Sequence, residues 1–300
     1  MIDPAAFKAY DVRGIYGTEL DEDGAYRIGR AYVDEFRPAR IAVGHDMRVS
    51  SPTMAAAVRE GAADGGAEVL DVGLIGTEML YFAVGDLGLD GGITVTASHN
   101  PKQYTGMKIV RAGALPVGGE SGLLDVRDRA LAAEWRSAAP GSIRDEDIWS
   151  RFVERVLSFV DVSSLRPLRV VIDAANGMAG AMLPPVLEQL PMLDVVRCYF
   201  EPDGSFPNHE PNPLLPENRE FIIGKTTEEK ANFGVAYDGD ADRCFFVDDT
   251  GDFVPGDFTT ALFAELILGR EPGGKIIYDV RASWAVPFRH RRAFQYLDHP

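Results

Sequence analysis

Short β-branched apolar runs alternate with longer amphipathic stretches along the first half of this chain. The pattern predicts strands over residues 40–43, 67–72, 92–95 and 107–110, and helices over residues 21–36, 51–64 and 77–87. Asp21 and Ser51 are predicted to cap two of these helices, because their side-chain oxygens accept hydrogen bonds from backbone N–H groups that the first helical turn leaves unpaired. This alternation is typical of α/β layers with helices packed on sheets.

The same alternation starts again in the second half, after a predicted helix over about residues 145–160. The next predictions are strands over 168–173, 194–200, 233–237 and 244–247, a helix over 216–230, and then a helix over 256–268 and a strand over 275–280. Residues 201–216 hold five prolines, which predicts a long surface loop. We therefore expect two α/β units, 1–148 and 149–252, with 253–300 as the start of a third.

Composition and charge narrow the class of protein. The chain has 300 residues, with 30 Lys and Arg against 46 Asp and Glu, so its formal charge is 30 − 46 = −16. Such a charge repels nucleic acid and anionic lipid, so neither is an expected partner. Two cysteines are too few for a disulfide framework, and residues 1–4 (MIDP) do not resemble the start of a signal peptide. We expect a cytoplasmic protein.

Three carboxylates at alternate positions form the sharpest chemical feature. Asp238, Asp240 and Asp242 lie between two predicted strands and are separated by Gly239 and Ala241. Alternate residues of a turn can direct hard oxygen ligands towards one point, as Mg²⁺ requires. The competing interpretation is a solvated acidic turn, although carboxylates this close repel each other unless a cation neutralises them.

A second feature is the segment from Thr96 to Pro101 (TASHNP), which follows a predicted strand. Ser98 and His99 suggest hydrolase chemistry, but neighbouring residues of an extended loop tend to point apart. The segment is equally compatible with a structural turn in which side chains bind backbone groups. His45, Asp46 and Arg48 also follow a strand, and residue type alone does not separate a helix-capping network from part of a site.

Five segments together resemble the α-D-phosphohexomutase family, most closely its phosphomannomutase/phosphoglucomutase branch. They are residues 8–14 (KAYDVRG), 43–52 (VGHDMRVSSP), 96–108, 238–243 (DGDADR) and 278–281 (YDVR). The resemblance implies tandem similar α/β units with mixed sheets between helices. It also implies reversible conversion of mannose or glucose 1-phosphate into the 6-phosphate, through a phosphoserine and a bisphosphorylated sugar, an isomerase activity.

The resemblance also implies roles for individual residues. Ser98 matches the family's phosphoserine, and a phosphoserine oxygen joins Asp238, Asp240 and Asp242 in holding Mg²⁺. Lys108 matches the proton-shuttling lysine. His99 and Arg243 match other catalytic residues of the family. Tyr10 and Arg13 match residues that bind the substrate. Mg²⁺ and a hexose 1,6-bisphosphate, which serves as activator and intermediate, are the implied cofactors, and a small phosphosugar is the implied partner.

The end of the sequence departs from the family pattern. The family's GExSG segment of the third unit and RxSGT segment of the fourth have no counterpart here, and residues 289–292 (RHRR) concentrate basic groups against the acidic trend. We therefore expect an incomplete third unit and no fourth, with 288–300 out of frame or a truncated product. Two other functions remain open: a fragment that binds Mg²⁺ or phosphosugar without turnover, and an aspartyl-nucleophile phosphatase.

Overall fold

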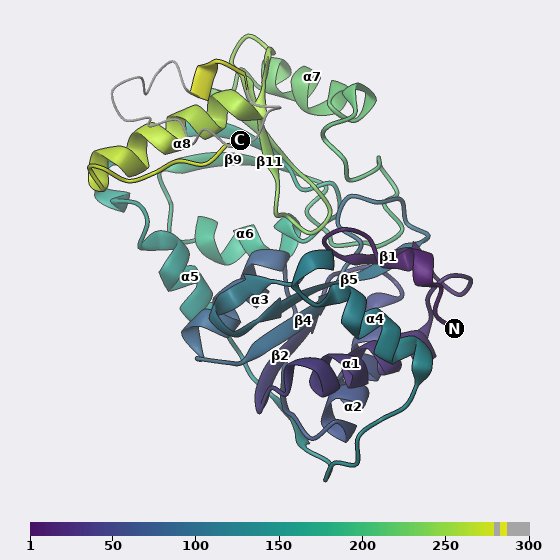
Figure 1. Ribbon diagram of the computed structural model, residues 1–300. Helices are drawn as coiled ribbons and strands as arrows, with labels where there is room; N and C mark the ends of the chain where they lie inside the picture. The colour runs from purple at the N-terminus through teal and green to yellow at the C-terminus, as the bar shows by residue number, and fades with distance from the viewer. Residues whose placement is uncertain (279–282, 287–300) are drawn as a thin grey trace.

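The computed structural model describes residues 1–278 and 283–286, which form two mixed sheets with helices on their faces (Figure 1). The strands of the first sheet lie in the order β1-β5-β4-β2-β3-β7, with β6 paired to β5. Their bounds are β1 Val12–Ile15, β2 Arg40–His45, β3 Glu68–Leu74, β4 Gly91–Val95, β5 Tyr104–Arg111, β6 Leu115–Pro116 and β7 Ser142–Asp145. Strand β2 pairs in parallel with β3 and β4, so the ends of these strands reach the same edge of the sheet.

Helices cover both faces of this sheet. One face carries α1 Glu22–Phe36, α2 Ser51–Asp64 and α4 Leu123–Ala132, whose apolar residues share a core with those of the strands. The other face carries α3 Thr77–Asp86 and α5 Trp149–Leu157. All five residues of β4 are buried, as expected for a strand between two layers of helices.

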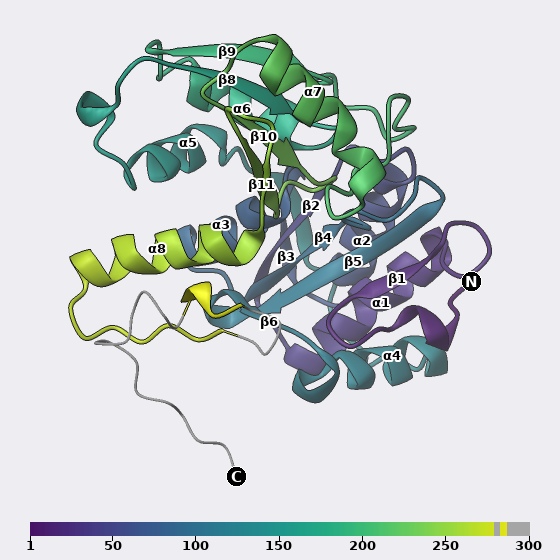
Figure 2. The ribbon, with the colours of Figure 1, turned by 90° about the horizontal axis from the view of Figure 1, so that it is seen from above.

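The second sheet has the order β12-β11-β10-β8-β9 and lies beside the first (Figure 2). Its strands are β8 Leu168–Asp173, β9 Leu193–Cys198, β10 Phe233–Tyr237, β11 Cys244–Asp248 and β12 Phe253–Val254. Helices α6 Ala179–Leu187 and α7 Glu220–Glu228 pack on it with separate apolar clusters. Short 3₁₀ turns occupy Pro4–Ala6, Ala112–Ala114, Gly119–Ser121, Val162–Ser164 and Pro216–Asn218. The expected class, tandem α/β units with mixed sheets, is confirmed.

A single apolar cluster joins the two sheets. Met79 and Leu80 of α3 pack in the same buried cluster as Met178 and Met182, which belong to the second sheet's layer of helices. Contact at Gly76 is so close that an added Cβ atom would lie 2.3 Å from Met182 Sδ and 3.1 Å from the Asp240 carbonyl oxygen. The absence of a side chain at Gly76 therefore permits this approach of the two sheets.

The predicted N-caps have different outcomes. Asp21 caps α1 as predicted, since its carboxylate accepts a hydrogen bond from Gly24 N at 3.0 Å. Ser51 does not cap α2: it is the first helical residue, and its hydroxyl donates to Asp46 Oδ1 at 2.5 Å. The prediction for Ser51 was wrong because the buried carboxylate of Asp46, five residues earlier, binds the hydroxyl.

One predicted helix is shorter in the structure, and one predicted strand is not formed across its described residues. The helix predicted over 145–160 is shorter, because residues 142–145 form β7 beside β3 and the Asp147 carboxylate accepts a hydrogen bond from Trp149 N at 2.9 Å. The strand predicted over 275–280 is not formed across 275–278, and 279–280 lie outside the described residues. No neighbouring strand pairs with 275–278 in the described part of the chain, so the backbone lacks the ladder that a strand requires. The interpretation of residues 288–300 also falls outside the described residues.

Helix α8 Gly256–Arg270 follows the second sheet and carries exposed apolar side chains. About half of the surface of each of Phe258, Leu262, Phe263, Leu266 and Ile267 is exposed. Across residues 1–278 and 283–286, no helix combines the length and apolar character needed to cross a bilayer.

The proline-rich loop over residues 201–216 is confirmed as a loop, and His209 anchors it. His209 Nε2 lies 2.9 Å from Asp173 Oδ2 at the end of β8, and Asn208 donates to Asn176 Oδ1 at 2.8 Å. Burial opposes protonation of His209, but the hydrogen bond and charge of Asp173 outweigh it and raise the pKa of the imidazole above 6.5. A protonated His209 therefore stabilises the anchored loop.

We expect His209→Gln to lower the free energy of unfolding by about 1.5 kcal/mol at pH 6, the usual size of a hydrogen bond to a charged group. Because folding raises the pKa, this contribution is complete below the unfolded value of 6.5 and is lost as pH rises through the folded value. Urea denaturation of both proteins at pH 6 and pH 8.5 measures the difference. An identical difference at the two pH values would show that the proton on His209 contributes nothing.

Candidate active site

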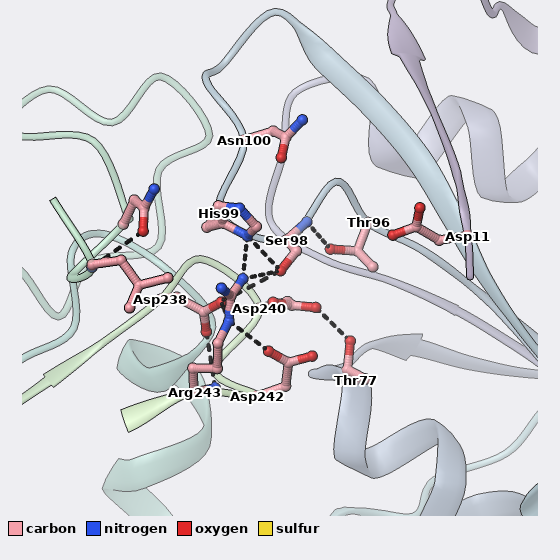
Figure 3. A network of polar contacts seen from close by, with 12 residues as sticks. Asp11, Thr77, Thr96, Ser98, His99, Asn100, Asp238, Asp240, Asp242 and Arg243 are labelled. Carbon is pink, nitrogen blue, oxygen red and sulfur yellow. Dashed lines mark hydrogen bonds and ion pairs between the residues drawn. The ribbon is translucent and has the colours of Figure 1, made fainter. Parts of the chain in front are cut away.

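Two loops from different sheets meet at the candidate site (Figure 3). The Ser98 loop follows β4 of the first sheet, and the acidic loop connects β10 to β11 of the second. Ser98 Oγ lies 3.3 Å from Asp238 Oδ2, although 140 residues separate them in sequence. The structure thus brings the two strongest chemical features of the sequence together.

The backbone of the Ser98 loop is constrained around the serine. Ser98 is 2% exposed and has φ +52°, a left-handed conformation that is uncommon for a residue with a side chain. Its N–H donates to Thr96 Oγ1 at 2.9 Å. Across the interface, a Cβ atom added to Gly239 would lie 2.4 Å from the Ser98 carbonyl oxygen, so glycine is required at that position of the acidic loop.

Arg243 connects the serine with the acidic loop. Its Nε donates to Asp238 Oδ2 at 2.8 Å and its Nη2 donates to Ser98 Oγ at 3.0 Å, while the same guanidinium also contacts His99 Nδ1. Burial and the positive charges of Arg243 and Arg13 lower the pKa of His99 to about 4, so the ring is neutral at pH 7. The contacts described for His99 are to Ser98 and Arg243, and neither supplies the carboxylate that orients histidine in a hydrolytic triad.

Lys108 of β5 reaches across to the acidic loop. Its Nζ donates to Asp240 Oδ2 at 2.6 Å and also to Asp242 Oδ2. Burial disfavours the charged ammonium, but the two carboxylates outweigh burial and raise the pKa of Lys108. For Asp240, burial likewise opposes ionisation, and the charge and hydrogen bond of Lys108 outweigh it and lower the pKa. Lys108 and Asp240 therefore form an ion pair in which the carboxylate is buried and the ammonium is partly buried.

Two other carboxyl groups near the site, those of Asp238 and Glu78, have raised pKa values. Burial, followed by the charge of Asp240, raises the pKa of Asp238. Burial raises the pKa of Glu78 to about 8, and its Oε2 has no hydrogen-bond partner among the described residues. Burial and the nearby carboxylates thus disfavour a negative charge on Asp238 and Glu78 unless a cation compensates it.

The three aspartates are arranged to hold a cation. One carboxylate oxygen from each of Asp238, Asp240 and Asp242 lies within 4.8 Å of the other two. Asp240 Oδ1 is buried and has no hydrogen-bond partner among the described residues, so one ligand atom is available without breaking any contact. The residues present therefore fit a divalent cation, for which clustered carboxylate oxygens are suitable ligands.

Thr77 is a site residue that the sequence analysis missed. Its hydroxyl donates to Asp240 Oδ2 at 2.5 Å and accepts from Lys108 Nζ at 3.2 Å. It begins α3, just beyond the end of β3, where the edge of a parallel sheet commonly places ligand-binding groups. The position of Thr77 just after a strand end is the sequence feature that could have indicated a site residue.

Arg13 and Tyr10 occupy different environments. Arg13 donates to Asn100 Oδ1 at 2.7 Å and to Asp11 Oδ2 at 2.6 Å, so it lies at the end of the Ser98 loop. Tyr10 is 84% exposed and near Gly118, and no contact in the described structure joins it to Ser98. Arg13 is therefore placed beside the serine, whereas Tyr10 faces solvent.

Comparison with known proteins agrees with this geometry. Residues 4–126 match the model of phosphoglucomutase/phosphomannomutase alpha/beta/alpha domain I, and residues 150–251 match that of domain II. A phosphomannomutase from Salmonella montevideo is 44% identical over 285 residues, covering 93% of this chain and 62% of the relative. Proteins named phosphohexose mutases from Xanthomonas campestris share 44% identity over 281 residues, with the same coverage. This chain therefore spans just under two thirds of the length of the curated relatives it matches.

A solved structure gives the same result. The crystal structure of a phosphoglucomutase/phosphomannomutase family protein from Burkholderia thailandensis superimposes with a TM-score of 0.89 at 36% identity, covering 98% of this chain and 65% of the other. The loops that carry Ser98 and Asp238 lie inside the ranges that the two domain models match. The chain belongs to the phosphoglucomutase/phosphomannomutase family.

Proposed function

We propose that this chain is a hexose-phosphate mutase that interconverts mannose or glucose 1-phosphate and the corresponding 6-phosphate. The observation that carries the proposal is the approach of Ser98 Oγ to Asp238 across the two domains, at 3.3 Å, with Lys108 at the neighbouring aspartates. A phosphoryl carrier, a cation site and a proton donor then share one site. Phosphoryl transfer depends chiefly on such positioning and on charge.

Ser98 is the proposed carrier of the phosphoryl group. Its Oγ–P bond breaks as the phosphoryl group moves to the open hydroxyl of a hexose monophosphate, which gives a bisphosphorylated sugar. After that sugar turns over in the site, its other phosphoryl group returns to Ser98 and the remaining monophosphate leaves. Arg243 lies close enough to bind a phosphoryl oxygen on Ser98, since its Nη2 already donates to Oγ at 3.0 Å.

Lys108 is the proposed proton carrier. Nζ contacts Asp240 and Asp242, which places it to exchange protons with the sugar oxygens. In the first transfer the neutral amine accepts the proton of the attacking sugar hydroxyl, and in the second transfer the ammonium returns a proton to the sugar oxygen that loses its phosphoryl group. Thr77 donates to Asp240 and accepts from Lys108, and thereby orients this pair.

Mg²⁺ is the proposed cation at Asp238, Asp240 and Asp242. The unpaired Asp240 Oδ1 and the approach of the three carboxylates support this choice. When bound, Mg²⁺ supplies positive charge that stabilises the transferring phosphoryl group. His99, neutral at pH 7, and Arg13 line the side of the site next to Ser98, where they are proposed to contact substrate, and Tyr10 is proposed to contact it from the solvent side.

The test is an assay of this chain with mannose 1-phosphate or glucose 1-phosphate, Mg²⁺ and a catalytic amount of hexose 1,6-bisphosphate. We expect the 6-phosphate to form and the reaction to stop when a chelator removes Mg²⁺. Release of inorganic phosphate without 6-phosphate would instead support the phosphatase. Absence of both products would support a chain that binds metal or phosphosugar without turnover.

A further inference from the structure

A buried arginine lies directly beneath the Ser98 loop. Arg48 is 1% exposed, and its guanidinium donates to the carbonyl oxygens of Ser98 at 2.8 Å and Asn100 at 2.5 Å. It also donates to the carbonyl oxygens of Pro101 at 3.0 Å and Tyr104 at 3.3 Å. One side chain thus binds four carbonyl groups of the loop that carries the serine.

The geometry of arginine suits this arrangement. The guanidinium is planar and its donors diverge in fixed directions, whereas the ammonium of lysine is compact and cannot reach four separated carbonyl groups at once. Asp46, 3.4 Å from Arg48 Nε, compensates the buried charge, and it also accepts hydrogen bonds from Ser51 and from Arg48 N. Asp46, Arg48 and Ser51 therefore form a hydrogen-bonded network that does not cap α2 through a side chain but contacts the Ser98 loop.

The second domain encloses the same arginine. The ring of Phe206 lies 5.1 Å from the Arg48 guanidinium carbon, and Phe206 itself has φ +48°. A Cβ atom added to Gly204 would come within 2.6 Å of Arg48 Cα and 2.7 Å of Val49 N. The loop over 201–216 therefore packs against the backbone and the side chain of Arg48 at once.

We propose that Arg48 is a positioning residue that sets the conformation of the Ser98 loop, and that Phe206 of the second domain holds Arg48 in place. Ser98 then adopts its strained, left-handed conformation only while the 201–216 loop is packed on Arg48. The consequence for phosphoryl transfer rests on the proposed function, whereas the mechanical link between the two loops does not. Arg48 acts through the backbone of the loop and is not itself a contact of Ser98 Oγ.

Hydrogen exchange measures the link directly. In Arg48→Lys, we expect amides of residues 97–104 to exchange at least about tenfold faster, with little change in β2 or β3, because the carbonyl groups of that loop lose their guanidinium donor. Phe206→Leu keeps an apolar side chain but removes the ring, and we expect the same segment to exchange faster although it belongs to the other domain. Equal exchange in 97–104 for both variants and the unmodified chain would overturn the proposal.

Two matched substitutions control for general destabilisation. Arg30 is a 6% exposed arginine that donates to the Arg136 carbonyl oxygen and lies 6.0 Å from the Trp135 ring, and Arg30→Lys is expected to leave 97–104 unchanged. Phe233 packs against Phe246 at 6.1 Å within the second domain and away from the 201–216 loop, so Phe233→Leu is the control for Phe206→Leu. Faster exchange of 97–104 in either control would show a global effect and overturn the proposal.

The second readout is the rate at which Ser98 takes up a phosphoryl group from hexose 1,6-bisphosphate, followed by intact mass. We expect Arg48→Lys to lower this rate at least about 30-fold, with Mg²⁺ affinity unchanged and Arg30→Lys within about threefold of the unmodified chain. An unchanged rate in Arg48→Lys would overturn the positioning role. If the unmodified chain takes up no phosphoryl group while exchange still rises in the two variants, the proposed function fails and the link between the loops stands.

Discussion

Ser98→Ala is expected to abolish phosphoryl uptake from hexose 1,6-bisphosphate, lowering its rate by at least about three orders of magnitude. The substitution removes the oxygen that forms the bond to phosphorus. It leaves Asp238, Arg243 and Lys108 in place, and the alanine methyl group fills most of the space of the hydroxymethyl group. Intact mass spectrometry shows the result as one phosphoryl group gained by the unmodified chain and none by the variant.

The matched control is Ser50→Ala, a substitution of another buried serine that follows a strand of the same sheet. It should gain the phosphoryl group at the normal rate. Phosphoryl uptake that persists in Ser98→Ala and is removed by hydroxylamine would identify an acyl phosphate, as on Asp238. That result would replace the mutase with the aspartyl-nucleophile phosphatase.

Lys108→Met is expected to cost about 3 kcal/mol of unfolding free energy in the absence of Mg²⁺. Methionine keeps the length of the side chain but removes the cation that pairs with Asp240, whose side chain is fully buried. An unpaired buried carboxylate is expensive, so the folded state loses stability or binds a proton. Urea denaturation with and without Mg²⁺ measures the effect.

Added Mg²⁺ should restore much of the stability of Lys108→Met, because a divalent cation neutralises the same three carboxylates. The unmodified chain should gain less, since its ammonium already offsets part of their charge. Lys225→Met is the matched control: Lys225 pairs with Glu228 and Glu229 on the surface of α7, and its loss should change little in either condition. An equal loss for Lys108→Met with and without Mg²⁺ would exclude a cation from this cluster.

Much of the α/β layering was predictable from the sequence because each buried strand is a short apolar run. The elements that were missed have weaker patterns. Strand β1 has four residues, includes Gly14 and lies at the edge of the sheet, where only its pairing with β5 defines it. Helix α4 has only three buried residues among ten, and β7 has all four residues exposed. The structure of such elements is determined by the elements they pack against, and the local sequence pattern does not reveal it.

The candidate site was predictable where its chemistry is local in sequence. Asp238, Asp240 and Asp242 are spaced to converge within one turn, and the structure brings one oxygen of each within 4.8 Å of the others. Thr77 and the loop contacts of Arg48 were not predictable, because they depend on which strand ends are neighbours. The register that sets His45 opposite Val95 brings Arg48 under a loop 50 residues away.

The apolar cluster shared by α3 and α6 has a thermodynamic consequence. Since Met79 and Leu80 are buried against Met178 and Met182, neither domain can lose its structure without exposing part of the other's core. Exposing that apolar surface costs free energy, so unfolding of one domain lowers the stability of the other. The serine and the acidic loop, which belong to different domains, are therefore thermodynamically coupled through this packing as well as through their own contacts.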